Sequence, residues 1–360
     1  MTFKLKYNLA SSNITDMRFF MKITYKSIFI SLSLAFYLFI VLGGQSIFSS
    51  TAGNDAQTIR ELDPSNVELG DSYAVMATIH SILPQDFLPI ITYFIGSIFI
   101  LYCYKDIKSK FNSLLIFFLL SIPIVFTIAA FQKDLILVLF IIPVYLILIS
   151  HIKISYKIIT ISTIYCIYAL IFRQYYYLIT FLFLCIFFFN GSNNYIKIML
   201  ILLVSSTFLL LPSNIYYELQ SARDVVNEFR INTSISGNRT AFPNPVTPSS
   251  LYNFIYNYIY AITRLNFGFF FTFNIKDLIF MPYPFIYFYY LLLGYISKDK
   301  TCQLASYLIL SHFLVYFLFE PDTGSYARHF SSTLPYLSII ILYSFNTKLK
   351  KGKKTIKDTL

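Results

Sequence analysis

Three short polar stretches interrupt the apolar runs of this chain of 360 residues. They read AAFQKDLIL, IFRQYYYLI and FEPDTGSYARHF, and each connects two apolar segments of membrane length. Their side chains could bind an anion or move a proton: Lys133, Asp134, Arg173, Tyr177, Glu320, Asp322, Arg328 and His329. A guanidinium matches a phosphate or a carboxylate with two parallel hydrogen bonds, whereas carboxylates and imidazole can accept a proton. Together these residue types predict a site that binds an anion and can carry a proton.

The third stretch has a spacing of its own. Pro321 and Gly324 favour a turn, because proline presets φ and glycine tolerates positive φ. The turn would aim Glu320 and Asp322 into a cavity. Residues 327–329 would open the following helix, whose N-terminus with Arg328 would form an anion cradle. For any one stretch, a structural ion pair or a side chain that reaches the membrane surface remains an alternative.

The composition indicates a membrane protein. The chain is 57% hydrophobic and only 12% charged, and its mean hydropathy is +0.64. Soluble domains are about 25% charged, so a core in water could not absorb this apolar surface. The four cysteines lie inside apolar runs without a CxxC pair, which predicts neither a metal site nor a disulfide framework.

Ten candidate spans of about 20 apolar residues or somewhat fewer follow from the hydropathy. They cover residues 27–48, 87–104, 113–130, 135–150, 158–172, 175–190, 196–212, 278–296, 302–319 and 330–346. We therefore expect an all-α polytopic membrane protein, in which residues 1–360 form a single integral membrane domain.

The charges predict the orientation. With both termini in the cytoplasm, 19 of the 28 Lys and Arg fall on the inner side, and all of these except Arg18 are lysines. This agrees with the excess of positive charge on cytoplasmic loops. The lysines lie at the ends of apolar runs, where they indicate topology and argue against nucleic acid as a partner. The outer side holds seven of the arginines, which favours an anionic ligand at the membrane interface; the alternative is ordinary surface pairing with nearby Asp and Glu.

Two longer outer loops are expected at about 49–86 and 213–277. Within the second, the aromatic run LYNFIYNYIYAITRLNFGFFFTFN predicts an amphipathic segment at the membrane surface. Two further spans or a re-entrant hairpin are the alternatives.

The run EPDTGSYARHFSSTLP resembles the acidic-Gly-Ser/Thr-x-x-Arg-His element near the C-terminus of bacterial O-antigen and capsule repeat-unit polymerases, the Wzy-type proteins with their EpsG-like branch. QKD and FRQYY occupy places where such proteins tend to show Lys-Asp and Arg-Tyr pairs. The plan of many spans with larger periplasmic loops is also similar.

The resemblance implies a glycosyltransferase of the bacterial inner membrane that joins undecaprenyl-diphosphate-linked oligosaccharide repeat units on the periplasmic face. It implies Arg328 and Arg173 at the diphosphate and Asp322 or His329 as the group that activates the acceptor. Lys133, Asp134, Glu320 and Tyr177 would complete the substrate site. A flippase and a chain-length regulator would be further partners, and neither a cofactor nor a metal is implied.

Three other functions remain open. A flippase for lipid-linked oligosaccharides would place cations along a path through the bundle, whereas these spans are nearly free of charge. A membrane acyltransferase would need a catalytic group on the inner face, where His151 is the only histidine expected. An O-antigen ligase or another transferase with a lipid-linked donor shares the chemistry, and the sequence barely separates it from a polymerase.

Overall fold

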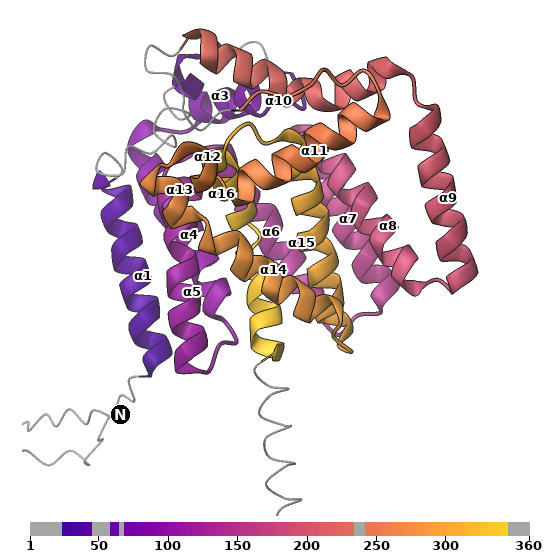
Figure 1. Ribbon diagram of the computed structural model, residues 1–360. Coiled ribbons are helices and arrows are strands. Elements are labelled where there is room, and N and C mark those ends of the chain that lie inside the picture. Colours follow the sequence, from indigo (N-terminus) through magenta and orange to yellow (C-terminus); the bar gives the residue numbers. More distant parts are fainter. Residues whose placement is uncertain (1–23, 45–57, 65–67, 234–241, 345–360) are drawn as a thin grey trace, which may run out of the picture.

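The computed structural model describes residues 24–44, 58–64, 68–233 and 242–344. Its regular elements in these ranges are helices, as the sequence predicts. Most of them stand side by side as a bundle, and several lie across its upper face (Figure 1). The long apolar stretches are helical because a chain in lipid must satisfy its backbone polar groups within itself.

The upright helices are α1 (Tyr25–Val41), α4 (Leu88–Tyr104), α5 (Lys110–Ile122), α6 (Lys133–Ile149), α7 (Ile154–Ile171), α8 (Tyr176–Gly191), α9 (Asn194–Leu210), α14 (Pro282–Tyr295) and α15 (Lys300–Phe319), with a last apolar helix at Leu334–Ser344. A π-helical turn, Pro123–Thr127, extends α5. Each of the ten predicted spans overlaps one of these helices.

Five helices in the described part of the chain are long and apolar enough to cross a membrane. They span Gln85–Tyr104, Lys110–Thr127, Ile154–Ile171, Ile275–Tyr295 and Lys300–Phe319. A sixth would be the pair Asn194–Leu210 and Ser213–Ser221, which is bent by 97°. The number of ten spans and the cytoplasmic position of both termini stay predictions.

Capping residues mark where several helices begin. The side chains of Thr24, Ser109, Asn193 and Asp299 each accept a hydrogen bond from a backbone N–H three residues further on. Such a bond satisfies one of the four N–H groups that a helix leaves without a partner at its start. All four of these caps stand before helices that begin with or contain lysine.

Helix α15 is the central element of the bundle. It packs against α8, α14, α6, α10 and α11, and most of its side chains are buried. The approach of α14 to α15 requires a glycine, since a Cβ on Gly294 would lie 2.1 Å from Ser306 Oγ. Because α15 ends at Phe319, this buried helix places Glu320 at its upper end.

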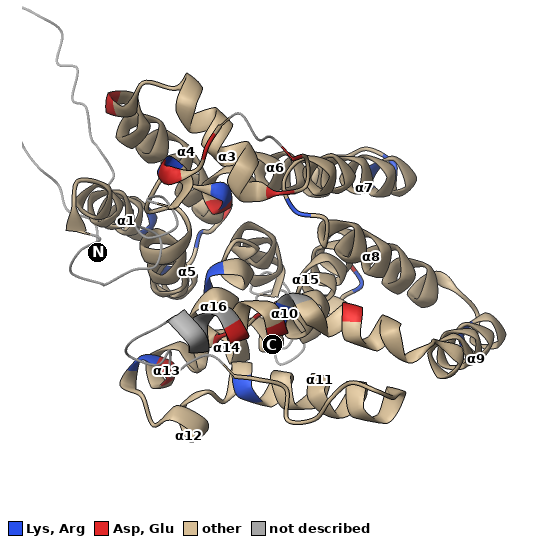
Figure 2. Cartoon of the chain, turned by 90° about the horizontal axis from the view of Figure 1, so that it is seen from above, with Lys and Arg blue, Asp and Glu red and all other residues tan. Residues whose placement is uncertain are grey.

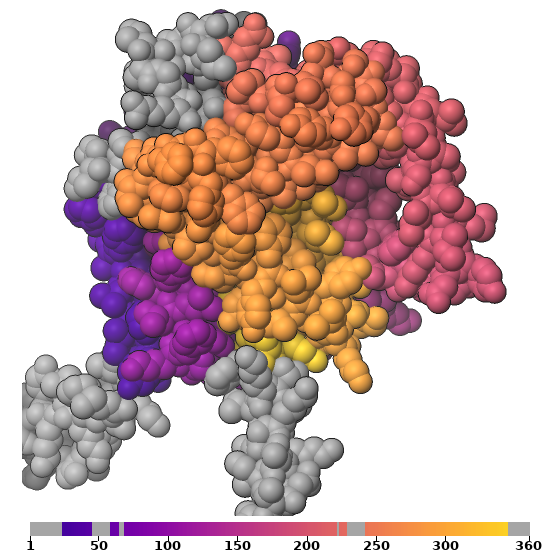
Figure 3. All heavy atoms as spheres, in the orientation of Figure 1, coloured from indigo at the N-terminus to yellow at the C-terminus, as the bar shows by residue number. Residues whose placement is uncertain are grey.

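The upper face carries α3 (Ser72–Ile82), α10 (Ser213–Thr233), α11 (Leu251–Asn266), α12 (Phe269–Thr272) and α13 (Ile275–Phe280) (Figures 1 and 3). α3 belongs to the first predicted outer loop, and the others belong to the second. α10 and α11 lie across the tops of the upright helices (Figure 1). α11 has buried residues on one side and exposed aromatics on the other, which agrees with the predicted amphipathic segment.

Helix α9 stands apart from the rest of the bundle. None of its residues is buried, and it lies at the edge of the bundle, beyond α8 (Figure 2). Its side chains are mainly Ile, Leu and Met, so this helix exposes a continuous apolar surface. Such a surface suits contact with lipid.

Candidate functional site

The three polar stretches of the sequence meet at one place near the upper end of the bundle. Asp134 is in the first turn of α6, and Arg173 lies between α7 and α8. Glu320 follows the last residue of α15, and Arg328 and His329 are in the last turn of α16 (Thr323–Ser331). Each of these five side chains is buried. We refer to them as the ion cluster.

Asp134 is the centre of the ion cluster. Arg173 Nη2 donates a hydrogen bond of 2.7 Å to Asp134 Oδ1, and Arg328 Nε lies 3.2 Å from Asp134 Oδ2. His329 Nε2 lies 3.5 Å from Asp134 Oδ1. One carboxylate thus stands between two guanidinium groups that come from different parts of the sequence.

Glu320 and His329 form a second pair within the cluster. His329 Nδ1 contacts Glu320 Oε1 at hydrogen-bonding distance, and Arg173 Nη1 lies 3.1 Å from His329 Nε2. A guanidinium only donates hydrogen bonds, so Nε2 accepts, and Nδ1 carries the proton that goes to Glu320. The pair therefore defines the tautomer of His329 and leaves Nε2 as its basic nitrogen.

Burial and charge act in opposite directions on Asp134. Burial alone would favour the neutral form of this carboxyl, but the adjacent guanidinium groups of Arg173 and Arg328 favour the ionised form. Asp134 is therefore ionised. Removal of one partner from such a buried pair costs about 3–5 kcal/mol, because the remaining charge has neither water nor a counter-ion.

Part of the first outer loop covers the cluster. The backbone of Asp71 bridges to that of Arg173, and Gly70 N donates to Ile171 O at 3.1 Å. Next to this contact, Lys133 Nζ lies 3.3 Å from the centre of the Tyr73 ring. Lys133, a predicted substrate ligand, is thus buried beside Asp134 under an aromatic ring from α3.

The structure corrects the prediction for residues 327–329. They do not open the last span; Arg328 and His329 lie at the C-terminal end of the separate helix α16, and the next helix begins at Leu334. The predicted anion cradle at a helix N-terminus is therefore wrong. The N-terminus of α16 is capped by Asp322, whose Oδ1 accepts a hydrogen bond of 2.8 Å from Ser325 N.

Asp322 is buried, and the hydrogen bond that it accepts from Ser325 N gives its carboxylate a structural role as the cap of α16. The catalytic role predicted for Asp322 stays a prediction. The sequence signal for the cap was present, because aspartate before Thr-Gly-Ser is a typical helix start.

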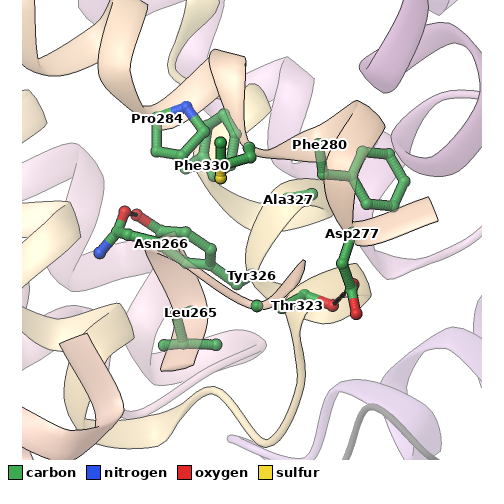
Figure 4. Close-up of a pocket in the computed structure, with 11 residues that line it drawn as sticks. Leu265, Asn266, Asp277, Phe280, Pro284, Thr323, Tyr326, Ala327 and Phe330 are labelled. Carbon is green, nitrogen blue, oxygen red and sulfur yellow. Dashed lines mark hydrogen bonds between the residues drawn. The ribbon is translucent and has the colours of Figure 1, made fainter. Parts of the chain in front are cut away.

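Both sides of α16 are held by neighbouring segments. Thr127, in the π-helical turn, donates to Arg328 O at 3.0 Å. On the opposite side, Thr323 Oγ1 donates to Asp277 Oδ1 at 2.6 Å, and Tyr326 Oη contacts Asn266 Oδ1 at 3.1 Å (Figure 4). These bonds limit rotation of the helix and so keep Arg328 and His329 directed at Asp134.

The cavity beside this second face of α16 is small. Its lining includes Asn266, Asp277, Thr323 and Tyr326, and it offers about 10 Å³ (Figure 4). A cavity of about 10–15 Å³ holds a single water molecule. This space is therefore part of the support of α16 and does not accommodate a sugar.

Tyr177, which was predicted to bind substrate, is not in the ion cluster. It is exposed and lines an apolar groove of about 610 Å³ between α7 and α8, together with residues such as Ile167 and Leu184. Its neighbour Tyr175 takes the place in the cluster, because its hydroxyl accepts a hydrogen bond of 3.0 Å from Arg173 Nη1. The sequence of three consecutive tyrosines, residues 175–177, does not by itself indicate which ring points into the ion cluster.

Comparison of this chain with family models, with curated proteins and with solved structures found no match. Among the residues that the structure describes, no group of three or more His, Cys, Asp and Glu side chains is placed to hold a metal ion. We therefore infer the function from the geometry of the described residues and from the sequence resemblance.

Proposed function

We propose that this protein is a glycosyltransferase of the bacterial inner membrane, which joins undecaprenyl-diphosphate-linked oligosaccharide repeat units into O-antigen or capsular polysaccharide on the periplasmic face. The observation that carries the proposal is the buried ion cluster, in which two arginines and a carboxylate-oriented histidine meet around Asp134. The sequence resemblance to repeat-unit polymerases involves these same residues.

The two arginines suit the leaving group of this reaction. A lipid diphosphate carries negative charge that grows on the departing oxygen, and it needs stabilisation more than protonation. Arg173 and Arg328 present two guanidinium groups around Asp134, and Lys133 adds a third cation nearby. Asp134 is a positioning residue, since it holds both guanidinium groups in place without contact to the substrate.

His329 suits the acceptor. Glu320 keeps the proton on Nδ1, so Nε2 can take the proton of the attacking sugar hydroxyl. Arg173 now donates to Nε2. When the diphosphate binds, Arg173 turns its Nη1–H to a phosphate oxygen, and Nε2 becomes free to act as the base.

The proposed step conserves atoms and charge. The acceptor oxygen forms a bond with C1 of the donor sugar, and its proton passes to His329 Nε2. The bond between C1 and the diphosphate oxygen breaks, and the electron pair leaves with the lipid diphosphate. Glu320 stabilises the imidazolium that results, in the way in which a carboxylate assists a histidine base in other enzymes.

The first test compares the surface polysaccharide of a strain that lacks the gene with strains that express wild type, Arg328→Ala or Arg60→Ala. Arg60 is an exposed arginine in the first outer loop and serves as the matched control. We expect wild type and Arg60→Ala to restore a ladder of chain lengths. Arg328→Ala should leave lipid A core with a single repeat unit, at equal amounts of protein in the membrane.

An unchanged ladder in the deletion strain would contradict the proposal. Loss of the single-unit band as well would point to a flippase, a ligase or an earlier step. A direct assay follows with purified protein and lipid-diphosphate-linked repeat units, in which a longer lipid-linked glycan and free lipid diphosphate must appear together.

A further inference from the structure

A second polar site lies on the upper face, away from the ion cluster. It is a cleft of about 520 Å³ between α10 and the segment 243–248. Side chains that can bind a polar ligand line it: Tyr217, Asp224, Asn227, Glu228 and Asn244. None of them belongs to the ion cluster or to the groove beside Tyr177.

Hydrogen bonds hold the polar wall of this cleft in one arrangement. Asn244 Nδ2 donates to both oxygens of Asp224, at 2.7 and 2.8 Å, and Arg223 Nη2 donates to Asn244 Oδ1. Asn227 Nδ2 donates to the carbonyl oxygen of Phe242 at 2.7 Å. A carboxylate and two amides are thus oriented before any ligand binds, which lowers the cost of binding.

The wall formed by the segment 243–248, from which Asn244 reaches Asp224, is also fixed. It contains Pro243, Pro245 and Pro248, whose φ angles are restricted by the ring. Asn257 of α11 binds both backbone groups of Val246, since Val246 N donates to its Oδ1 at 3.2 Å and its Nδ2 donates to Val246 O at 2.7 Å. The cleft therefore has two stiff walls.

The cleft is connected to the element that carries Glu320. Arg223 is fully buried, and its Nη1 donates to Phe317 O at 3.3 Å in the last turn of α15. Phe317 precedes Glu320 by three residues. The same arginine thus contacts Asn244 in the cleft wall and the end of the central helix.

The chemistry of the lining selects the ligand. Carboxylate and amide oxygens accept hydrogen bonds from hydroxyl groups, and the half-exposed ring of Tyr217 offers an apolar face on which a sugar ring can stack. The described lining residues include two carboxylates and no lysine or arginine, so a phosphate or a uronic acid would be repelled. Uncharged sugars, or amino sugars, fit this pattern.

We propose that this cleft is a glycan-binding subsite, which holds uncharged sugars of the repeat unit while the lipid diphosphate occupies the ion cluster. The identity of the glycan rests on the proposed function; the cleft itself does not. Arg223 is a positioning residue, because it orients Asn244 and, through it, Asp224.

The test is a titration of the purified full chain in nanodiscs. The probe is the free oligosaccharide released by mild acid from the strain's own lipid-linked repeat units, and saturation-transfer NMR reports the sugar protons that contact the protein. Asp224→Asn keeps the shape of the side chain but removes a charged acceptor, and Tyr217→Ala removes the ring. We expect each to weaken binding about 10-fold or more.

Matched controls make the result specific. Glu218→Gln removes an exposed carboxylate of the same helix that does not line the cleft, and Tyr217→Phe keeps the ring; both should bind within about twofold of wild type. Absence of binding by wild type at millimolar probe overturns the inference. Equal binding by wild type, Asp224→Asn and Tyr217→Ala also overturns it.

The failure of this inference can be told from the failure of the proposed function. Arg328→Ala should abolish chain extension and leave binding of the free oligosaccharide unchanged. If the gene deletion leaves the polysaccharide ladder intact while Asp224→Asn still weakens binding, the polymerase proposal fails and the subsite stands. If the ladder depends on Arg328 and binding does not depend on Asp224, the subsite is refuted alone.

Discussion

Replacement of Asp134 by asparagine tests the role of the ion cluster most directly. The change keeps the shape of the side chain and an oxygen that can accept from Arg173 Nη2, now 2.7 Å away. It removes the negative charge between Arg173 and Arg328, which are both buried. The two guanidinium groups then keep their charges without the carboxylate that stands between them.

The expected cost follows from this arrangement. Loss of one partner in a buried ion pair costs about 3–5 kcal/mol. With an unfolding entropy of about 2.1 cal/mol/K per residue, a chain of this length should lose about 4–7 °C in melting temperature. The exposed Asp86→Asn is the control, and it should shift the melting temperature by less than about 1 °C.

The buried cysteines provide the assay. Cys103 and Cys302 are free and buried, so a maleimide dye that fluoresces on reaction with a thiol reports unfolding of the detergent-purified protein. The exposed Cys185 is blocked beforehand. A melting temperature of Asp134→Asn within about 1 °C of wild type would refute the claim that this carboxylate neutralises two buried guanidinium groups.

Three further predictions concern other residues. Glu320→Gln should lower the rate of chain extension on the order of 10–100-fold with little change in apparent substrate affinity, because the imidazolium of His329 loses its counter-ion; a pH–rate profile identical to wild type would contradict this. Burial lowers the pKa of His80, whose Nε2 contacts Phe131 O at 3.0 Å. The stability that neutral His80 contributes is therefore present above pH ~6.5 and is lost as the pH falls below that value. The difference between the melting temperatures at pH 7.5 and pH 5.5 should be smaller in His80→Gln than in wild type. Gly70→Ala should destabilise by about 1 kcal/mol or more, because Gly70 has φ +93° and a Cβ would lie 2.8 Å from Gln174 Nε2; equal melting temperatures would show that the first outer loop does not depend on this turn.

The upright helices could be predicted from the sequence because each is an apolar run with a polar end. The ends of α6 and α15 were placed within a few residues, since Lys133 and Glu320 interrupt the apolar runs there. Hydropathy cannot tell a short buried helix from a complete span. The last apolar helix, Leu334–Ser344, shows this limit, because it starts after the separate helix α16 and not at the predicted residue 330.

The site could be predicted as a set of residue types but not as an arrangement. Asp134, Arg173 and Arg328 were candidates because ionisable groups near membrane depth are rare. Whether these side chains come together depends on which helices are neighbours and on how each helix is rotated about its axis. The local sequence pattern predicts neither of these. For this reason the sequence did not separate Tyr175, which binds Arg173, from Tyr177, which lies in the apolar groove.

The depth at which buried polar side chains lie in the helix bundle helps to distinguish a transferase from a transporter. The ion cluster is made from helix ends and connections, where Asp134, Arg173 and Glu320 stand. Deeper along α15 lies the buried His312, whose ring nitrogens contact Tyr165 Oη at 3.0 Å and Tyr316 Oη at 2.7 Å. Its nitrogens are thus both engaged by phenol groups, which makes this histidine part of the bundle's packing. A path for a charged headgroup through the bundle would need cations at several depths. In the described residues the buried arginines lie beneath the upper face, whereas the buried Lys157 lies at the other end of α7 and donates to Leu148 O at 2.6 Å. With the buried guanidinium groups gathered at one end, the arrangement favours chemistry at a membrane surface over transport across it.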